Sequence, residues 1–226
     1  AHDDGILGHG GTTMLQLYCG CTSLLTAGYP MKNGDEMAST LQDFIRHHGA
    51  PNALFRDNAK AQIGHAVHES LRMYAIKDFQ CEPYHQHQNY AERRIQEVKN
   101  LSNQLMDRTN TRPNLWLLCV NYSIYLLNRL ATERLDWKTP IEAATGQQPD
   151  ISALLAFRWY EPIYFRAPLK QSFPSSSLER TGRIVGIAEH QGDTLTFLVL
   201  DDLTDNVVAR SELRSALDPT GTQSSC

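Results

Sequence analysis

The first 150 residues alternate between strand-like and helix-like spacing of their apolar side chains. Residues 12–29 are rich in Thr, Leu and Tyr, and a Cys-Gly-Cys break at 19–21 divides them, which predicts two strands joined by a turn. At residues 37–48 the apolar side chains recur every three or four positions and Gly49 follows, which predicts an amphipathic helix. The short apolar run at 53–55 predicts a central strand covered on both faces.

Four further helices are predicted between residues 65 and 146. One covers residues 65–76, and one begins at Pro113 with enough apolar side chains to be either a core or an interface element. A short one starts at Thr139-Pro140 and ends near Gly146. Between them lies a long helix, whose apolar stripe steps by four, three, four and three through Ala91, Ile95, Val98, Ser102 and Leu105.

The pattern changes to period two after about residue 157. Short strands are predicted at 160–165, 182–188, 195–200 and 207–209, with a Gly-Asp hairpin signal at 192–193. Together they indicate a small barrel or curled sheet. We therefore predict an α/β domain over residues 1–150, a small all-β module over 151–218 and a disordered tail over 219–226, with a flexible link at 170–177.

Composition places the 226-residue chain among ordinary globular proteins, because 41% of its residues are hydrophobic and 20% are charged. The net charge of -4 argues against nucleic-acid binding through bulk charge alone. The charge is uneven, however: residues 92–138 carry eight basic and five acidic side chains, a local balance of +3.

No apolar run approaches the roughly 18 residues of a membrane span, and the five scattered cysteines favour a reducing, intracellular compartment. The chain lacks both a secretory leader pattern and a starting Met, which predicts a fragment of a longer product.

Three carboxylates stand out by their predicted positions. Asp4, or its neighbour Asp3, lies near a first strand, Asp57 ends the central strand, and Glu92 begins the long helix. Such a cluster suits Mg²⁺, which prefers hard oxygen ligands, and paired Mg²⁺ ions promote phosphodiester chemistry. Each acid also has an ordinary explanation: a polar chain end, a turn residue, and a negative charge that complements a helix N-terminus.

Residues around Glu92 favour a nucleic-acid site. Lys99 follows Glu92 by seven residues, on the same side of the helix, and could reach a DNA phosphate. Gln88 lies in the loop that would border the same pocket, and Arg93 or Arg94 could help to position DNA. A solvated surface lysine is the ordinary alternative for Lys99.

Three motifs resemble the integrase core of copia-type LTR retrotransposons: Phe-Arg-Asp-Asn-Ala at 55–59, Glu-Pro-Tyr at 82–84 and Gln-Asn-Tyr-Ala-Glu at 88–92. Gly-Arg-Ile-Val-Gly at 182–186 resembles the small SH3-like β module that follows the core in that family. The resemblance implies an RNase H-like mixed five-stranded sheet with flanking helices, followed by that module. It also implies a metal triad of Asp4, Asp57 and Glu92.

The same resemblance implies a function, which is 3′-end processing and strand transfer of element DNA into target DNA. It further implies two Mg²⁺ (or Mn²⁺) ions held by the triad, DNA contacts at Gln88, Asn89, Arg93 and Lys99, a homo-oligomer, no membrane, and a location in the nucleus or a cytoplasmic particle. One alternative is a catalytically inactive integrase remnant that binds nucleic acid or self-associates. Another is a stand-alone RNase H-like nuclease, which would cleave RNA–DNA hybrids.

Overall fold

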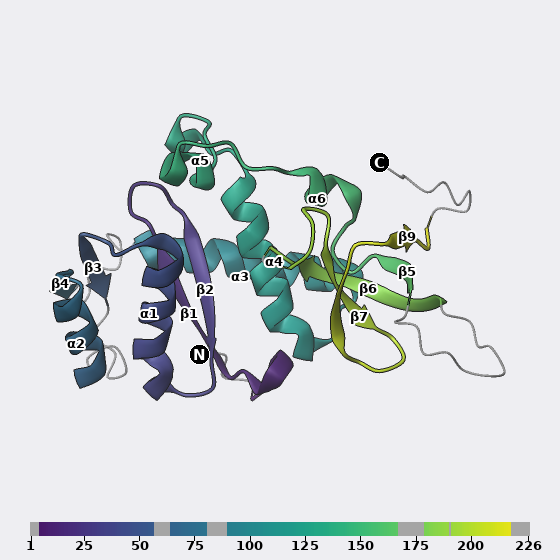
Figure 1. The fold of residues 1–226 in the computed structure, drawn as a ribbon, viewed down its shortest axis with the longest axis horizontal. Coiled ribbons are helices and arrows are strands. Elements are labelled where there is room, and N and C mark those ends of the chain that lie inside the picture. The colour runs from purple at the N-terminus through teal and green to yellow at the C-terminus, as the bar shows by residue number, and fades with distance from the viewer. Residues whose placement is uncertain (1–4, 57–63, 81–89, 167–178, 190, 218–226) are drawn as a thin grey trace.

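The computed structural model describes residues 5–56, 64–80, 90–166, 179–189 and 191–217, and shows a mixed α/β half followed by an antiparallel sheet (Figure 1). The regular elements of the first half are β1 (Met14–Cys19), β2 (Thr26–Met31), α1 (Met37–His48), β3 (Ala53–Arg56), α2 (His65–Met73), β4 (Lys77–Gln80), α3 (Tyr90–Thr109), α4 (Trp116–Arg129) and α5 (Pro140–Thr145). The second half contains α6 (Ser152–Ala156), β5 (Pro162–Arg166), β6 (Glu179–Ile187), β7 (Phe197–Asp201), β8 (Val207–Arg210) and β9 (Leu213–Ser215). Short 3₁₀ turns occupy His9–Gly11, Gly34–Glu36, Pro113–Leu115 and Glu133–Leu135.

The strands of the first half form two pairs. β1 and β2 pair antiparallel, from Met14 opposite Met31 to Cys19 opposite Thr26, and β3 pairs in parallel with β4. Among the described residues these pairs remain separate two-stranded sheets, whereas the resemblance implies one five-stranded sheet. The strand predicted to carry Asp4 falls on residues 1–4, outside the described residues.

One hydrophobic core joins α1 and α2 to these strands. α1 ends where it was predicted to end, because Gly49 adopts a φ of 83° that most side chains disfavour. The buried members of this core are Tyr18, Met31, Met37, Leu41, Ile45, Val67, Leu71 and Ile76.

The prediction that β3 is covered on both faces is wrong. Leu54 packs against the core, but Phe55 points to the other side and is 58% exposed. Its ring stacks on that of Phe79 in β4, with centroids 5.0 Å apart, and Phe79 is itself 45% exposed. An apolar run gives a strand, but the number of layers that cover the strand depends on neighbours elsewhere in the chain.

An ion pair between a buried arginine and a partly exposed aspartate ties β3 to β4. Arg56, the residue before Asp57, is 5% exposed, and its Nε donates to Asp78 Oδ1 at 2.7 Å. This hydrogen bond from Arg56 lowers the pKa of Asp78 below its usual range. The end of β3 is therefore held by a charge-assisted contact.

Replacing Asp78 by Asn should lower the free energy of unfolding at pH 7 by about 1–3 kcal/mol, because it removes the negative charge that pairs with the buried Arg56 guanidinium. Since the folded-state pKa of Asp78 is lowered, the pair stabilises fully above the unfolded-state pKa of about 3.9 and is lost as the pH falls through the folded-state value. Urea unfolding should thus show the two proteins converging below about pH 4. Asp43→Asn, which removes an exposed pair with Arg46, is the control and should change stability by less than about 0.5 kcal/mol. Equal stability of Asp78→Asn and wild type at pH 7 would contradict this account.

α3 and α4 pack against each other through small polar and apolar side chains. Val98 and Ser102, members of the predicted stripe, are 1% and 3% exposed. The hydroxyls of Ser102 and Ser123 lie 2.9 Å apart between the two helices. α4 also contacts β2 and β6. The helix predicted from Pro113 is thus a core element of the chain, and its role as an interface stays a prediction.

The second half is an antiparallel sheet in the order β8-β7-β6-β5-β9. Four of its strands match the predicted ones, and Gly192, with a φ of 70°, lies in the predicted hairpin between β6 and β7. α6 and β9 were not predicted. The sheet shares a hydrophobic core with α4, whose buried members are Leu115, Leu118, Cys119, Tyr122, Trp159, Val185 and Leu200.

The predicted link at 170–177 and the tail at 219–226 lie outside the described residues. Within the described ranges, no helix combines the length and the apolarity that a membrane crossing requires.

Candidate functional site at the start of helix α3

The structure describes three of the residues assigned to the site. Glu92 lies in the first turn of α3, as the sequence predicts, and its side chain is partly exposed. Arg93 and Lys99 are exposed on the same helix. The other assigned residues, Asp4, Asp57, Gln88 and Asn89, lie outside the described residues, so the convergence of the triad stays a prediction.

Helix geometry sets the directions of the described side chains. At about 100° per residue, Glu92 and Lys99 lie on the same side of α3, and Arg94 lies on nearly the opposite side from Glu92. Glu92 therefore supplies a hard oxygen donor, of the kind Mg²⁺ prefers, and Lys99, two turns further along the same side of the helix, can reach an anion. The described part of the chain contains no group of three His, Cys, Asp or Glu side chains that could hold a metal ion. Of the three predicted metal ligands, the described part of the chain contains Glu92 alone.

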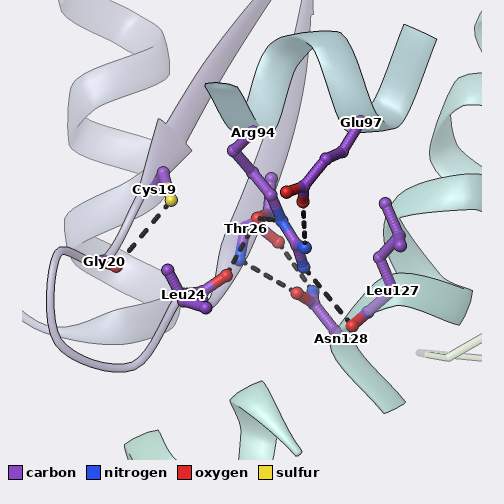
Figure 2. Close-up of polar contacts among 8 residues, drawn as sticks. All are labelled: Cys19, Gly20, Leu24, Thr26, Arg94, Glu97, Leu127 and Asn128. Atoms are coloured by element: carbon purple, nitrogen blue, oxygen red, sulfur yellow. Dashed lines mark hydrogen bonds and ion pairs between the residues drawn. The ribbon is translucent and has the colours of Figure 1, made fainter. Parts of the chain in front are cut away.

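The prediction that Arg94 could position DNA is wrong. The residue is 5% exposed, and its guanidinium is used inside the protein. Nε donates to Thr26 Oγ1 at 2.9 Å, and the two terminal nitrogens contact Glu97 Oε2 at 2.8 Å and the Leu127 carbonyl at 3.3 Å (Figure 2). The guanidinium consequently links α3 to β2 and α4.

Asn128 completes this arrangement at the start of β2. Its Oδ1 accepts from the Thr26 amide at 3.0 Å and its Nδ2 donates to the Thr26 carbonyl at 2.7 Å, which is the pairing a neighbouring strand would offer. The Thr26 hydroxyl also donates to the Leu24 carbonyl at 3.1 Å. We call the set formed by Thr26, Arg94, Glu97, Asn128 and the Leu127 carbonyl the Arg94 node (Figure 2).

A sequence signal for the node exists, although it is weak. Arg94 is three residues after Ala91 and one before Ile95, so it borders the apolar stripe of α3. Arg93, one position earlier, faces away from that stripe. The two adjacent arginines thus have opposite environments. Their positions around the helix axis distinguish the buried residue from the exposed one, whereas their residue type is the same.

The chain was compared with protein-family models and with solved structures. No protein-family model matches the chain. In structure it is similar to a chain of the simian T-cell lymphotropic virus intasome in complex with PP2A regulatory subunit B56 gamma, with a TM-score of 0.52, 18% identity, and coverage of 91% of this chain and 73% of that one. It also matches the HTLV-2 integrase catalytic core domain in complex with magnesium, with a TM-score of 0.49, 21% identity, and coverage of 57% and 83%. The elements of the structure confirm the mixed α/β class, and the likeness to the intasome chain is consistent with an RNase H-like fold.

In sequence, the chain is similar to the Retrovirus-related Pol polyprotein from transposon RE2 of Arabidopsis thaliana, with 23% identity over 135 residues. The match covers 57% of this chain and 9% of that polyprotein. The resemblance to a transposon Pol polyprotein is thereby confirmed. The copia-type assignment and the SH3-like module stay predictions.

Proposed function

We propose that the chain is the core of a retrotransposon integrase, which joins element DNA to target DNA by metal-dependent phosphoryl transfer. The observation that carries the proposal is the similarity to a transposon Pol polyprotein over 135 residues, because a fold alone hosts many functions. The position of Glu92 in the first turn of α3 supports it, since this is the residue that the resemblance assigns to the triad. The chain spans only 9% of the polyprotein it matches, so the activity of the whole protein is part of the proposal.

In this proposal Asp4, Asp57 and Glu92 hold two Mg²⁺ or Mn²⁺ ions. Such ions, when bound, activate an attacking oxygen and neutralise charge on the phosphate. The chain itself supplies the carboxylates and the groups that orient DNA. Arg93 and Lys99 are exposed and can bind phosphates. Gln88 borders the same pocket in the sequence prediction, and the resemblance assigns a DNA contact to Asn89.

The proposal includes a partner and an assembly. Residues 92–138 carry a local charge of +3, although Arg94 is buried and Arg112 and Arg129 pair with acids outside this range. The exposed Arg93 and Lys99 favour a DNA contact along α3. The HTLV-2 core has been solved in a trimeric and a dimeric form, and we propose that this chain also forms a homo-oligomer. A nuclear or cytoplasmic-particle location remains a prediction.

Replacing Asp57 by Asn should abolish joining of a short labelled duplex in the presence of Mn²⁺, because Asn lacks the negative charge that metal binding requires. Gel analysis of joined and nicked products, with and without EDTA, measures this effect. Wild-type joining by Asp57→Asn would refute the role of Asp57. An RNA–DNA hybrid is the second substrate: its cleavage, without joining of DNA, would favour the stand-alone nuclease. Equal background in wild type and variant on both substrates would favour the inactive remnant.

A further inference from the structure

We propose that Arg94 is the positioning residue for Glu92, and that the Arg94 node holds the first turn of α3 in the geometry that metal binding requires. This inference rests on the proposed function, in which Glu92 is a metal ligand. Arg94 acts through the backbone of the turn, and its side chain lies nearly opposite that of Glu92. It is therefore a support for the site and no part of the surface that DNA would contact.

The first turn of α3 needs such a support. α3 begins at Tyr90, so Glu92 is its third residue. The first turn of a helix lacks the intrahelical partners that hold later turns, and helix ends fray. A metal ligand placed there is ordered only if tertiary contacts hold the turn.

The contacts of Arg94 supply this order from two other elements. Its Nε is held by the side chain of Thr26 in β2, and one terminal nitrogen by the carbonyl of Leu127 in α4. Asn128 in turn fixes the Thr26 backbone through two hydrogen bonds of 3.0 and 2.7 Å. The turn is consequently tied to a strand and to a core helix through one rigid planar group (Figure 2).

The choice of a charged residue favours a geometric role over a purely stabilising one. Burying a guanidinium costs desolvation energy, and Glu97, its described counter-ion, keeps a side chain that is 49% exposed. An apolar side chain would fill the same space without this cost. A guanidinium, however, directs several hydrogen bonds at fixed angles, which an apolar side chain cannot do. Groups that hydrogen-bond a metal ligand directly typically change metal affinity by 10–100-fold when they are replaced, and we expect an effect near the lower end of that range for Arg94, which acts through the helix backbone.

The test uses the full chain and four variants: Arg94→Met, Thr26→Val, Glu92→Gln and the control Arg108→Met. Arg108 is exposed near the other end of α3, so its variant removes a charge from the same helix without touching the node. Thr26→Val keeps the shape of the side chain and removes the hydroxyl that accepts the hydrogen bond from Arg94 Nε. This variant tests the inference if Arg94→Met fails to fold. Hydrogen exchange of the metal-free protein measures order in the first turn, and calorimetry measures the Kd for Mn²⁺.

We expect faster exchange confined to residues 90–97, and a Kd for Mn²⁺ raised about tenfold or more, in Arg94→Met and Thr26→Val. Arg108→Met should match wild type in both measurements. Wild-type Mn²⁺ affinity in Arg94→Met or Thr26→Val, together with a loss in Glu92→Gln, would overturn this inference alone. An unchanged affinity in Glu92→Gln would overturn the proposed function and the inference with it. Uniformly faster exchange along the whole chain with an unchanged Kd would reduce Arg94 to a structural residue and also overturn the inference.

Discussion

Replacement of Glu92 by Gln is expected to reduce Mg²⁺-dependent joining of DNA by about 10³-fold or more, with the fold retained. Gln has nearly the size of Glu and keeps an oxygen, but it lacks the negative charge that makes a carboxylate a ligand for hard cations. Glu92 is partly exposed in the first turn of α3, so its replacement disturbs no core contact. The loss of a negative charge near a helix N-terminus should lower the free energy of unfolding by only about 0.3–1 kcal/mol.

Single-turnover joining with saturating duplex measures this effect apart from DNA binding. Asp107→Asn is the matched control, because Asp107 is an exposed acid near the other end of the same helix. We expect it to join DNA at the wild-type rate. A Glu92→Gln protein that keeps more than about a tenth of wild-type joining in Mg²⁺ would remove Glu92 from the set of metal ligands.

The helices α1 to α5 could be predicted because their signals are local. Pro140 and Gly146 bound α5 as expected, with Thr139 accepting from the Glu142 amide at its start. The stripe from Ala91 to Leu105 similarly predicts α3, and Val98 in its middle is 1% exposed. Periodicity and capping depend on residues within a few positions of each other, so one sequence suffices to find them.

The surroundings of β3 and of Arg94 could not be predicted in the same way. Phe55 is exposed although it lies in an apolar run, because coverage depends on elements that the run does not specify. Arg94 is buried although it is charged, because Thr26 and the Leu127 carbonyl, distant in sequence, receive its hydrogen bonds. A guanidinium that borders an apolar stripe can turn toward solvent or toward the core, and only the tertiary structure decides which.

The position of the candidate site was partly accessible from sequence. Glu92 was placed correctly at the start of a helix, because a short motif and a helical stripe coincide there. The meeting of Glu92 with Asp4 and Asp57 depends on contacts over long sequence separations and stays a prediction. The Arg94 node was missed for the same reason: its members come from β2, α3 and α4, which are far apart along the chain.

The contact between α4 and the C-terminal sheet is a further feature that the sequence did not indicate. The predicted boundary at residue 150 separates two parts, but α4 and the sheet meet in one of the chain's hydrophobic cores. Trp159 is 3% exposed, its ring centroid lies 5.3 Å from that of Tyr122 in α4, and its Nε1 donates to Thr111 Oγ1 at 3.2 Å. Arg112, next to Thr111, forms an ion pair with Asp205 in the loop after β7. These contacts predict that the α/β half and the sheet unfold together.

Trp159→Ala should therefore lower the free energy of unfolding of the whole chain by about 3–5 kcal/mol, the usual cost of emptying a large aromatic site in a core. Urea unfolding followed by circular dichroism at 222 nm and by tryptophan fluorescence should give coincident transitions in wild type, since α4 of the first half and the sheet of the second half pack in the same core around Trp159. Trp137→Ala is the matched control: Trp137 is 72% exposed, and its loss should change stability by less than about 0.5 kcal/mol. A Trp159→Ala protein whose helical signal unfolds as in wild type would show that the two halves are energetically independent, with residue 150 as a true domain boundary.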